Sequence, residues 1–307
     1  MADKLEGVDL LKTPLHGIYI PVALCIFGIT ILNYDYLPYV VGLLALYISF
    51  NIIRVKLKRP VLSSTKFQDY ELIDKTIISK NSAIYRFKLY NEYDQLNIPV
   101  GHHLACKVEI DGKDEIRYYT PISNQLDEGF FDIIVKSYKD GKVSKYFATL
   151  SPGDKVLFKG PVGRMSYRTN MAKKIIMIAG GSGITPMLSV LGSIVTTPED
   201  TTEVKLLFAN ETENDILLKE ELDVYLEEYP NFDLRYFVKH PSPSWNGYTG
   251  WITKDVLKKE LSEPNDDTKI FICGPMDMKK QMLHDLEELG WSKGVLQSKQ
   301  DDQVFCF

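Results

Sequence analysis

The apolar segments of this chain change their spacing near residue 171, and that change restricts the folds open to it. Before this point the apolar runs are short and lie at residues 84–90, 104–110, 131–138 and 154–160. Asp-Gly, Pro-Gly and Gly-Pro pairs, which are strong turn signals, fall between them. Short strands at regular intervals predict a small antiparallel β-barrel, which we assign to residues 61–171.

After residue 171, apolar strands alternate with helical segments. The predicted strands are 173–180, 204–210, 232–240 and 269–275. The predicted helices follow them at 181–195, 217–229, 252–261 and 276–289. This alternation is typical of a parallel sheet of nucleotide-binding type, which we assign to residues 172–307. The predicted fold class is therefore an all-β domain followed by an α/β domain.

The N-terminal segment has a different composition. From Thr13 to Ile53 the only formal charge is Asp35, which separates two apolar runs. These runs are Ile18–Leu32 and Tyr36–Ile53. The second has 18 residues, close to the length that crosses a bilayer ~30 Å thick. Residues 1–60 are therefore predicted to form a membrane anchor with its basic flank.

A basic cluster follows the second apolar run and consists of Arg54, Lys56, Lys58 and Arg59, before Pro60. Lys and Arg beside a span favour the cytosolic side, so the remaining chain is predicted to be cytosolic. The sequence leaves open whether one run spans the membrane or both form a hairpin. A buried helix pair of a soluble fold is the alternative. The mitochondrial outer membrane is favoured over the endoplasmic reticulum, although both fit a short anchor with a basic flank.

Charge and cysteine content exclude several functions. The net charge of −5 gives no general case for binding nucleic acid. The spacing of the four cysteines matches neither a zinc site nor a disulfide framework, and no metal site is predicted. Residues 64–170 carry a balance of +2, whereas residues 171–307 carry −9. A negatively charged macromolecule would therefore dock on the first domain rather than the second.

The stretch RYYTPIS at 117–123 gathers groups that suit a flat cofactor with a phosphate. Arg117 is a permanent cation whose planar fork matches phosphate oxygens. In an extended segment Tyr118 and Tyr119 point to opposite faces, so one ring can lie against a ligand while the other packs. Thr120 adds a hydrogen-bonding group beside them. Taken alone, the same residues also occur in strands that bind no ligand.

The stretch GKVSKYF at 141–147 places a glycine turn before a predicted helix start. Ser144 and the backbone N–H groups of 142–144 could hold a pyrophosphate, as helix N-termini do. An ordinary turn capped by serine is the alternative.

Two further turns lie at the carboxyl ends of predicted strands. GGSGITP at 180–186 connects a strand to a helix, as a dinucleotide loop does, but Pro186 stands where the usual fingerprint has its last glycine. CGPMDM at 273–278 makes a second exposed turn at the sheet edge where ligands of open α/β sheets collect. Cys273 by itself also fits a small buried hydrophobe.

The four motifs together resemble the ferredoxin–NADP reductase superfamily in order and spacing. They are RxYTxxS at 117–123, GxxS at 141–144, GGxGxTP at 180–186 and CGP at 273–275. The sequence segments IAGGSGITPM, NETENDILL and the terminal DQVFCF are similar to those of the NADH–cytochrome b5 reductase family, of the fungal membrane-anchored type. The resemblance covers about residues 62–307.

The resemblance implies FAD and NADH as cofactors. It implies that they are bound by Arg117, Tyr119, Thr120, Ile134, Lys136, Tyr138, Lys142, Val143, Ser144, Gly180, Gly181, Thr185, Asn210, Asp215, Cys273, Gly274, Pro275 and Phe307. Among these, Thr120 near the flavin N5, and Lys136 and Cys273 near the nicotinamide, are the catalytic residues that it implies. Arg117 would bind the FAD phosphates, and Tyr119 would lie against the flavin. Residues 210–215 would meet the adenosine end of the donor.

NADH is favoured over NADPH, because the acidic side chains of NETEND at 210–215 would repel a 2′-phosphate. One position argues the other way. Where the family often has an acidic residue after the third strand, this chain has Lys239 and then His240. Lys239 could tolerate a 2′-phosphate.

The resemblance implies cytochrome b5, an acidic haem protein, as the acceptor that docks on the first domain. It also implies a role in passing electrons to a small iron protein of diphthamide synthesis. The alternatives are a related NADH-dependent flavin reductase that serves a desaturase component or a quinone, and a flavin-binding redox sensor without turnover.

Overall fold

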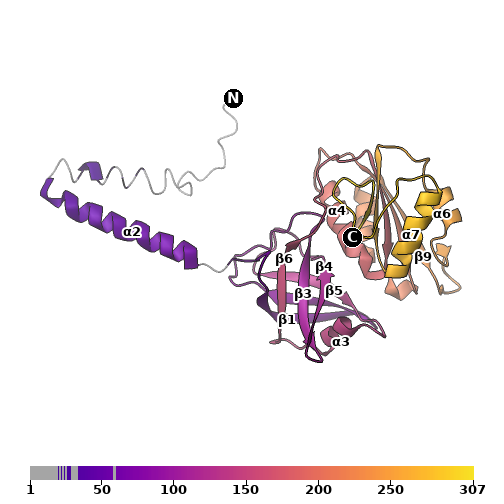
Figure 1. Cartoon of the computed structure of the whole chain (residues 1–307), viewed down its shortest axis with the longest axis horizontal. Helices are drawn as coiled ribbons and strands as arrows, with labels where there is room; N and C mark the ends of the chain where they lie inside the picture. The colour runs from indigo at the N-terminus through magenta and orange to yellow at the C-terminus, as the bar shows by residue number, and fades with distance from the viewer. Residues whose placement is uncertain (1–19, 21, 23, 25, 29–33, 58–59) are drawn as a thin grey trace. The chain divides into compact units, whose positions relative to one another are not determined.

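The computed structural model describes residues 20, 22, 24, 26–28, 34–57 and 60–307. It divides into two compact units, Met1–Pro60 and Val61–Phe307, which are described separately. The second unit contains two sheets that differ in strand direction (Figure 1).

The first unit contains the short 3-10 helix η3 (Tyr34–Tyr36) and helix α2 (Leu37–Leu57). Within the described part of the chain, no helix combines the length and the apolar character that a bilayer crossing requires. The predicted membrane span is therefore not found among these residues. The first apolar run, 18–32, lies largely outside the described residues.

The first sheet of the second unit is antiparallel and has the order β4-β3-β6-β1-β2-β5. Its strands are β1 (Gln68–Ser79), β2 (Ser82–Lys88), β3 (His103–Ile110), β4 (Lys113–Tyr119), β5 (Phe130–Lys136) and β6 (Lys155–Val162). Helix α3 (Lys142–Thr149) follows β5. Residues at the start of β1 are buried and exposed in strict alternation. This period of two places apolar residues on one face of the sheet.

The predicted closed barrel is wrong, because the edge strands β4 and β5 form no ladder with each other. β4 ends at Tyr119, and Pro121 has no backbone N–H with which to continue the pairing. Two isolated contacts take its place. The Ile122 amide donates to the Asp132 carbonyl oxygen at 2.9 Å, and the Asp132 amide donates to Ser123 Oγ at 3.2 Å.

An aromatic cluster fills the space enclosed by this sheet. Phe87, Phe131, Phe147 and Phe158 are fully buried. Phe87 stacks on Phe131, with ring centroids 5.4 Å apart, and meets Phe158 edge-on at 4.9 Å. Phe147 comes from α3, so burial of this ring fixes the helix against the sheet.

The second sheet is parallel and has the order β10-β9-β8-β7-β11-β12. Its strands are β7 (Lys174–Gly180), β8 (Glu203–Asn210), β9 (Phe232–Val238), β10 (Tyr248–Thr249), β11 (Thr268–Cys273) and β12 (Val304–Cys306). The connecting helices are η4 (Gly181–Gly183), α4 (Ile184–Val195), η5 (Glu213–Asp215), α5 (Lys219–Glu228), α6 (Lys254–Glu260) and α7 (Met276–Glu288). The predicted alternation of strands and helices is confirmed.

The parallel sheet is buried on both faces, which explains its continuous apolar strands. In β7, Ile175 and Met177 face one apolar cluster, while Ile176 and Ile178 face the other. The first cluster includes residues of α4 and α5, and the second includes residues of α6 and α7. Figure 1 shows α4 and α7 beside this sheet.

Apolar and polar contacts join the two halves of this unit. Ile134 of β5 and Met165 belong to the apolar cluster that α4 covers. Arg164 donates to the carbonyl oxygens of Ser298, Leu296 and Cys306 at 2.9, 3.2 and 3.1 Å. The segment after β6 is thereby fixed against the C-terminal strand.

Candidate cofactor-binding site

The RYYTPIS segment ends strand β4 and turns toward β5. As predicted, Tyr118 and Tyr119 point to opposite faces: Tyr118 is 64% exposed, whereas Tyr119 packs against the aromatic core. The Tyr119 ring lies 5.4 Å from the ring of Phe147. Thr120 is buried, at 8% exposure. The segment thus supplies an aromatic ring and a hydroxyl beside α3.

Two cations from different elements converge beside this segment. Arg117 Nη1 of β4 and Lys142 Nζ of α3 lie 3.5 and 3.0 Å from the two carboxylate oxygens of Glu115. The hydrogen bond and charge of Lys142, followed by the charge of Arg117, lower the pKa of Glu115. An anionic group placed here would meet a guanidinium and an ammonium, which suits a phosphate.

The N-terminus of α3 adds backbone donors to this cation pair. α3 begins at Lys142 after Gly141, and the first N–H groups of a helix have no partner within it. Ser144 Oγ accepts from the Tyr138 amide at 3.2 Å and lies 3.3 Å from the Gly141 carbonyl oxygen. A side chain at Gly141 would overlap that hydroxyl. Ser144 therefore shapes the turn, and the backbone N–H groups remain the donors for an anion.

The turns GGSG and CGP meet backbone to backbone. A Cβ at Gly183 would overlap the Cys273 carbonyl group, and one at Gly180 would come within 3.0 Å of Pro275. Gly181 has a φ of +53°, in the left-handed region that favours glycine. Only glycine permits this approach, so the two turns form one edge at the carboxyl ends of β7 and β11.

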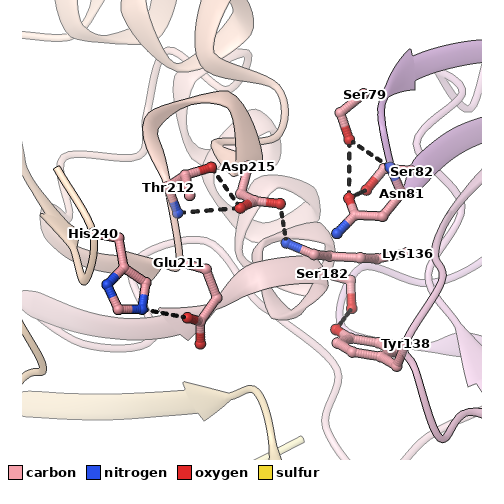
Figure 2. Close-up of polar contacts among 10 residues, drawn as sticks. All are labelled: Ser79, Asn81, Ser82, Lys136, Tyr138, Ser182, Glu211, Thr212, Asp215 and His240. Atoms are coloured by element: carbon pink, nitrogen blue, oxygen red, sulfur yellow. Dashed lines mark hydrogen bonds and ion pairs between the residues drawn. The ribbon is translucent and has the colours of Figure 1, made fainter. Parts of the chain in front are cut away.

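A buried ion pair connects the two halves beside these turns (Figure 2). Lys136 Nζ of β5 lies 2.8 Å from Asp215 Oδ1 of η5, and the side chains are only 7% and 14% exposed. Asp215 Oδ2 accepts from the Thr212 amide at 3.1 Å and from Thr212 Oγ1 at 2.7 Å, in a capping box. The structure thus brings together two residues that the sequence assigned to opposite ends of NADH.

The pKa of Asp215 is lowered from its ordinary value of 3.8. Burial acts in the opposite direction, but the hydrogen bonds from Lys136 and Thr212, the charge of Lys136 and a hydrogen bond from Asn81 outweigh it. The carboxylate is therefore ionised at neutral pH, and the pair is a true ion pair.

Tyr138 makes a second contact between the halves. Its hydroxyl lies 3.2 Å from Ser182 Oγ of η4 (Figure 2). Ser182 also accepts, through its carbonyl oxygen, from Thr185 Oγ1 at 3.2 Å. Thr185 is buried in the first turn of α4, which begins at Ile184 as the sequence predicts within a few residues. Tyr138, Gly181 and Thr185 are thus brought to one place.

Asn210 at the end of β8 has a buried side chain whose amide nitrogen and oxygen find no hydrogen-bond partner among the described residues. The residue is 7% exposed. Buried polar groups are nearly always hydrogen-bonded, so an unpaired amide at a sheet edge points to a ligand. Its donor and acceptor suit ribose hydroxyls.

The Cys273 thiol lies at the end of β11, next to Gly274 and Pro275. Burial raises the pKa of this thiol to about 12. The group is therefore a neutral thiol rather than a thiolate at physiological pH.

The remaining predicted residues have structural positions as well. Ile134 and Val143 are buried, and each belongs to a different apolar cluster. Phe307 contacts the rings of Phe271 and Phe305 at 5.9 and 5.0 Å. Its carbonyl oxygen accepts from Lys279 Nζ at 3.1 Å.

Two residues of the site, Glu115 and Asn81, escape prediction, and a third, Thr212, lies within the predicted segment 210–215 but has a capping role that was not predicted. Glu115 shares a strand face with Arg117 two residues later, so period-2 spacing could have found it. Thr212 begins a Thr-x-x-Asp capping pattern, which is also visible in the sequence. Asn81 lies in the β1–β2 turn between Ser79 and Ser82, and only the fold brings it near Asp215 (Figure 2).

A pocket of about 530 Å³ lies beside α3 and the β1–β2 turn. Its lining includes Tyr138 and four lysines, Lys75, Lys80, Lys139 and Lys145. The concentration of ammonium groups suits an anionic ligand or partner.

These observations fit a dinucleotide and a flavin nucleotide. The cations Arg117 and Lys142 with the N-terminus of α3 suit a pyrophosphate. The glycine turns at the carboxyl ends of β7 and β11, and the Asn210 amide that has no partner among the described residues, suit a second nucleotide at the parallel sheet.

Comparisons with known proteins agree with this site. The oxidoreductase FAD-binding domain family matches residues 69–167, and the oxidoreductase NAD-binding domain family matches residues 177–284. The cytochrome b5 reductase domain of Ulva prolifera nitrate reductase superposes with a TM-score of 0.72 at 34% identity. That match covers 80% of this chain and 100% of the solved domain.

Whole-chain relatives are more similar still. The plasma membrane-associated coenzyme Q6 reductase PGA3 of Saccharomyces cerevisiae is 49% identical over 99% of both chains. NADH-cytochrome b5 reductase 1 of Coccidioides immitis is 44% identical over 96% of this chain and 98% of its own. With both domain families matched in the predicted order, this chain belongs to the NADH–cytochrome b5 reductase family and is an NADH-dependent FAD oxidoreductase.

Proposed function

We propose that this protein takes electrons from NADH and passes them singly to cytochrome b5. The observation that carries the proposal is the pair of contacts between the two halves, Lys136 with Asp215 and Tyr138 with Ser182 of the GGSGITP turn, which join the half matched to FAD binding to the half matched to NAD binding. Bound FAD would supply the chemistry that links a two-electron hydride donor, NADH, to a one-electron acceptor.

The chain's own residues bind and orient the two nucleotides. Arg117, Lys142 and the N–H groups at the start of α3 hold the FAD phosphates. Tyr119 and Thr120 lie beside the flavin, and the raised pKa of Cys273 keeps its thiol neutral next to the nicotinamide. Stacking two rings in a fixed site converts their encounter into a reaction within one complex.

Lys136 forms an ion pair with Asp215. We propose that a nucleotide phosphate replaces this carboxylate as its partner. Lys136 then orients the donor while remaining paired, so binding exchanges one ion pair for another and avoids an unpaired buried cation.

The antiparallel half is the proposed docking face for cytochrome b5. Its positive balance and the lysines around the pocket beside α3 support this choice. Long-range attraction of this kind raises association rates and weakens with salt.

A quinone is the second candidate acceptor. The support is the 49% identity to a relative named as a coenzyme Q6 reductase of the plasma membrane. The same relative supports association with a membrane, and it favours the plasma membrane over the predicted mitochondrial outer membrane or endoplasmic reticulum. The predicted transfer to an iron protein of diphthamide synthesis has no support from the relatives and is left out of the proposal.

The deciding experiment uses purified full-length protein. Bound FAD should bleach on addition of NADH, and its colour should return with ferricyanide. Cytochrome b5 and a short-chain quinone are then offered in parallel at matched concentrations. Rapid haem reduction that slows with added salt supports the cytochrome, and rapid quinone reduction supports the second candidate. Protein that folds but retains no flavin would refute both.

A further inference from the structure

A second cluster of charges lies at the carboxyl ends of β8 and β9. Glu211 Oε2 lies 3.2 Å from Lys239 Nζ and 3.7 Å from His240 Nε2. The Lys239 ammonium also lies over the ring of Trp251, 4.6 Å from its centroid. One carboxylate thus faces the Lys239 ammonium and the His240 imidazole, and Figure 2 shows Glu211 with His240.

The backbone fixes this cluster. β8 and β9 are paired up to Asn210 and Val238, and the pairing continues beyond the strands. The Lys239 amide donates to the Asn210 carbonyl oxygen at 3.0 Å, and the His240 amide donates to the Glu211 carbonyl oxygen at 2.8 Å. Because main-chain bonds hold these residues in place, substitution of one side chain should leave the others where they are.

The unpaired amide of Asn210 lies one residue before Glu211. It is buried to more than nine-tenths, and its donor and acceptor are unused within the described chain. Ligands of open α/β sheets bind outside the carboxyl ends of the strands, and an acidic residue there can hydrogen-bond a ribose 2′-hydroxyl. Both residues therefore lie at the strand end where such a ligand would bind.

We propose that Glu211 determines the choice between NADH and NADPH. The inference rests on the proposed NADH-dependent function and assigns this specificity to one residue. The Glu211 carboxylate repels a 2′-phosphate directly, and it also holds Lys239 and His240, the groups that would attract one. The lysine after β9 is therefore compatible with a preference for NADH.

The test is Glu211→Gln in the full-length holoenzyme, with ferricyanide as acceptor. The ratio of kcat/KM for NADPH to kcat/KM for NADH should rise about tenfold, because one repulsive charge is removed and the Lys239 ammonium is released. Adding Lys239→Gln to that variant should cancel most of the gain. Glu220→Gln, an exposed carboxylate in the first turn of α5, is the matched control and should leave the ratio unchanged.

Binding of 2′,5′-ADP and 5′-AMP, measured by calorimetry, gives a readout without turnover. Glu211→Gln should strengthen 2′,5′-ADP binding about tenfold relative to 5′-AMP. An unchanged ratio in both assays would overturn the inference, as would an equal rise of the ratio in the Glu220→Gln control. Failure of the proposed function is seen separately, because wild-type protein would then not oxidise NADH with ferricyanide.

Discussion

Lys136 Nζ and Asp215 Oδ1 lie 2.8 Å apart in a buried ion pair that connects the antiparallel and parallel halves. The two residues are 79 positions apart in the chain. Each is held by its own element: Lys136 ends β5, and Asp215 caps η5 through Thr212. The pair therefore couples the relative position of the two nucleotide sites to one electrostatic contact.

Asp215→Asn should destabilise the protein by about 3 kcal/mol, because it leaves the Lys136 ammonium buried without a partner. Asparagine can still accept from Thr212, so the loss belongs mainly to the ion pair. Urea unfolding followed by circular dichroism measures the change. The exposed pair Lys219–Asp223 is the control, and Asp223→Asn should cost less than ~0.5 kcal/mol. Equal losses of unfolding free energy in Asp215→Asn and Asp223→Asn would show that the buried ion pair is no more stabilising than the exposed one.

The ion pair also predicts a pH dependence. The folded-state pKa of Asp215 is below its ordinary 3.8, so its stabilisation is present above that value and is lost as the pH falls through the folded pKa. Wild-type protein should therefore lose more stability between about pH 5 and pH 3 than Asp215→Asn does. Urea midpoints of both proteins across this range provide the measurement. Parallel curves would show that Asp215 is not the group responsible.

The raised pKa of the partly buried Cys273 thiol predicts slow alkylation. With a pKa of about 12, its thiolate is scarce at pH 8, whereas an ordinary cysteine titrates near 8.5. Iodoacetamide should therefore modify it about 1,000-fold more slowly than a free cysteine at that pH. Mass spectrometry of the peptide that contains Cys273 follows the rate, with added glutathione as the reference thiol. Rapid labelling at pH 8 would contradict the buried, neutral thiol.

Gly183→Ala should destabilise the junction of the two turns by up to about 3 kcal/mol, because the new Cβ overlaps the Cys273 carbonyl group. Gly112→Ala is the control. Its φ of +71° carries strain of ~1 kcal/mol, but nothing lies within 4 Å of the added atom. Thermal unfolding of both holoproteins compares them. If Gly112→Ala proved equally costly, close approach would not be the reason for glycine at 183.

Arg117→Gln should weaken FAD binding about tenfold to a hundredfold, because a charge-assisted bond to phosphate is lost. Glu115→Gln should act in the opposite direction, since it removes the carboxylate that competes for Arg117 and Lys142. Fluorescence of released flavin during dilution measures both affinities. The exposed Arg168→Gln is the control for general loss of charge, and a similar effect there would remove the case for Arg117.

Much of the fold could be predicted, because its signals are local. The apolar runs of β7 and β11 and the helices after them follow from contacts between residues a few positions apart. Whether the first sheet closes into a barrel could not be predicted, because closure depends on pairing between β4 and β5. Pro121 interrupts that pairing. The membrane span was inferred from composition alone and is not found in the described residues.

The sequence by itself determined the two-domain order, the cofactor motifs and the glycines of the turns. These features depend on the backbone preferences and side-chain chemistry of residues that are close together in the chain. Only the tertiary structure decided that Lys136 meets Asp215, that Glu211 holds Lys239 and that the Asn210 amide finds no partner among the residues that the structure describes. These relationships join segments from different strands. The physical reason is that an ion pair or an unpaired amide depends on the distance and burial that chain folding creates, and neither quantity is encoded in residue type.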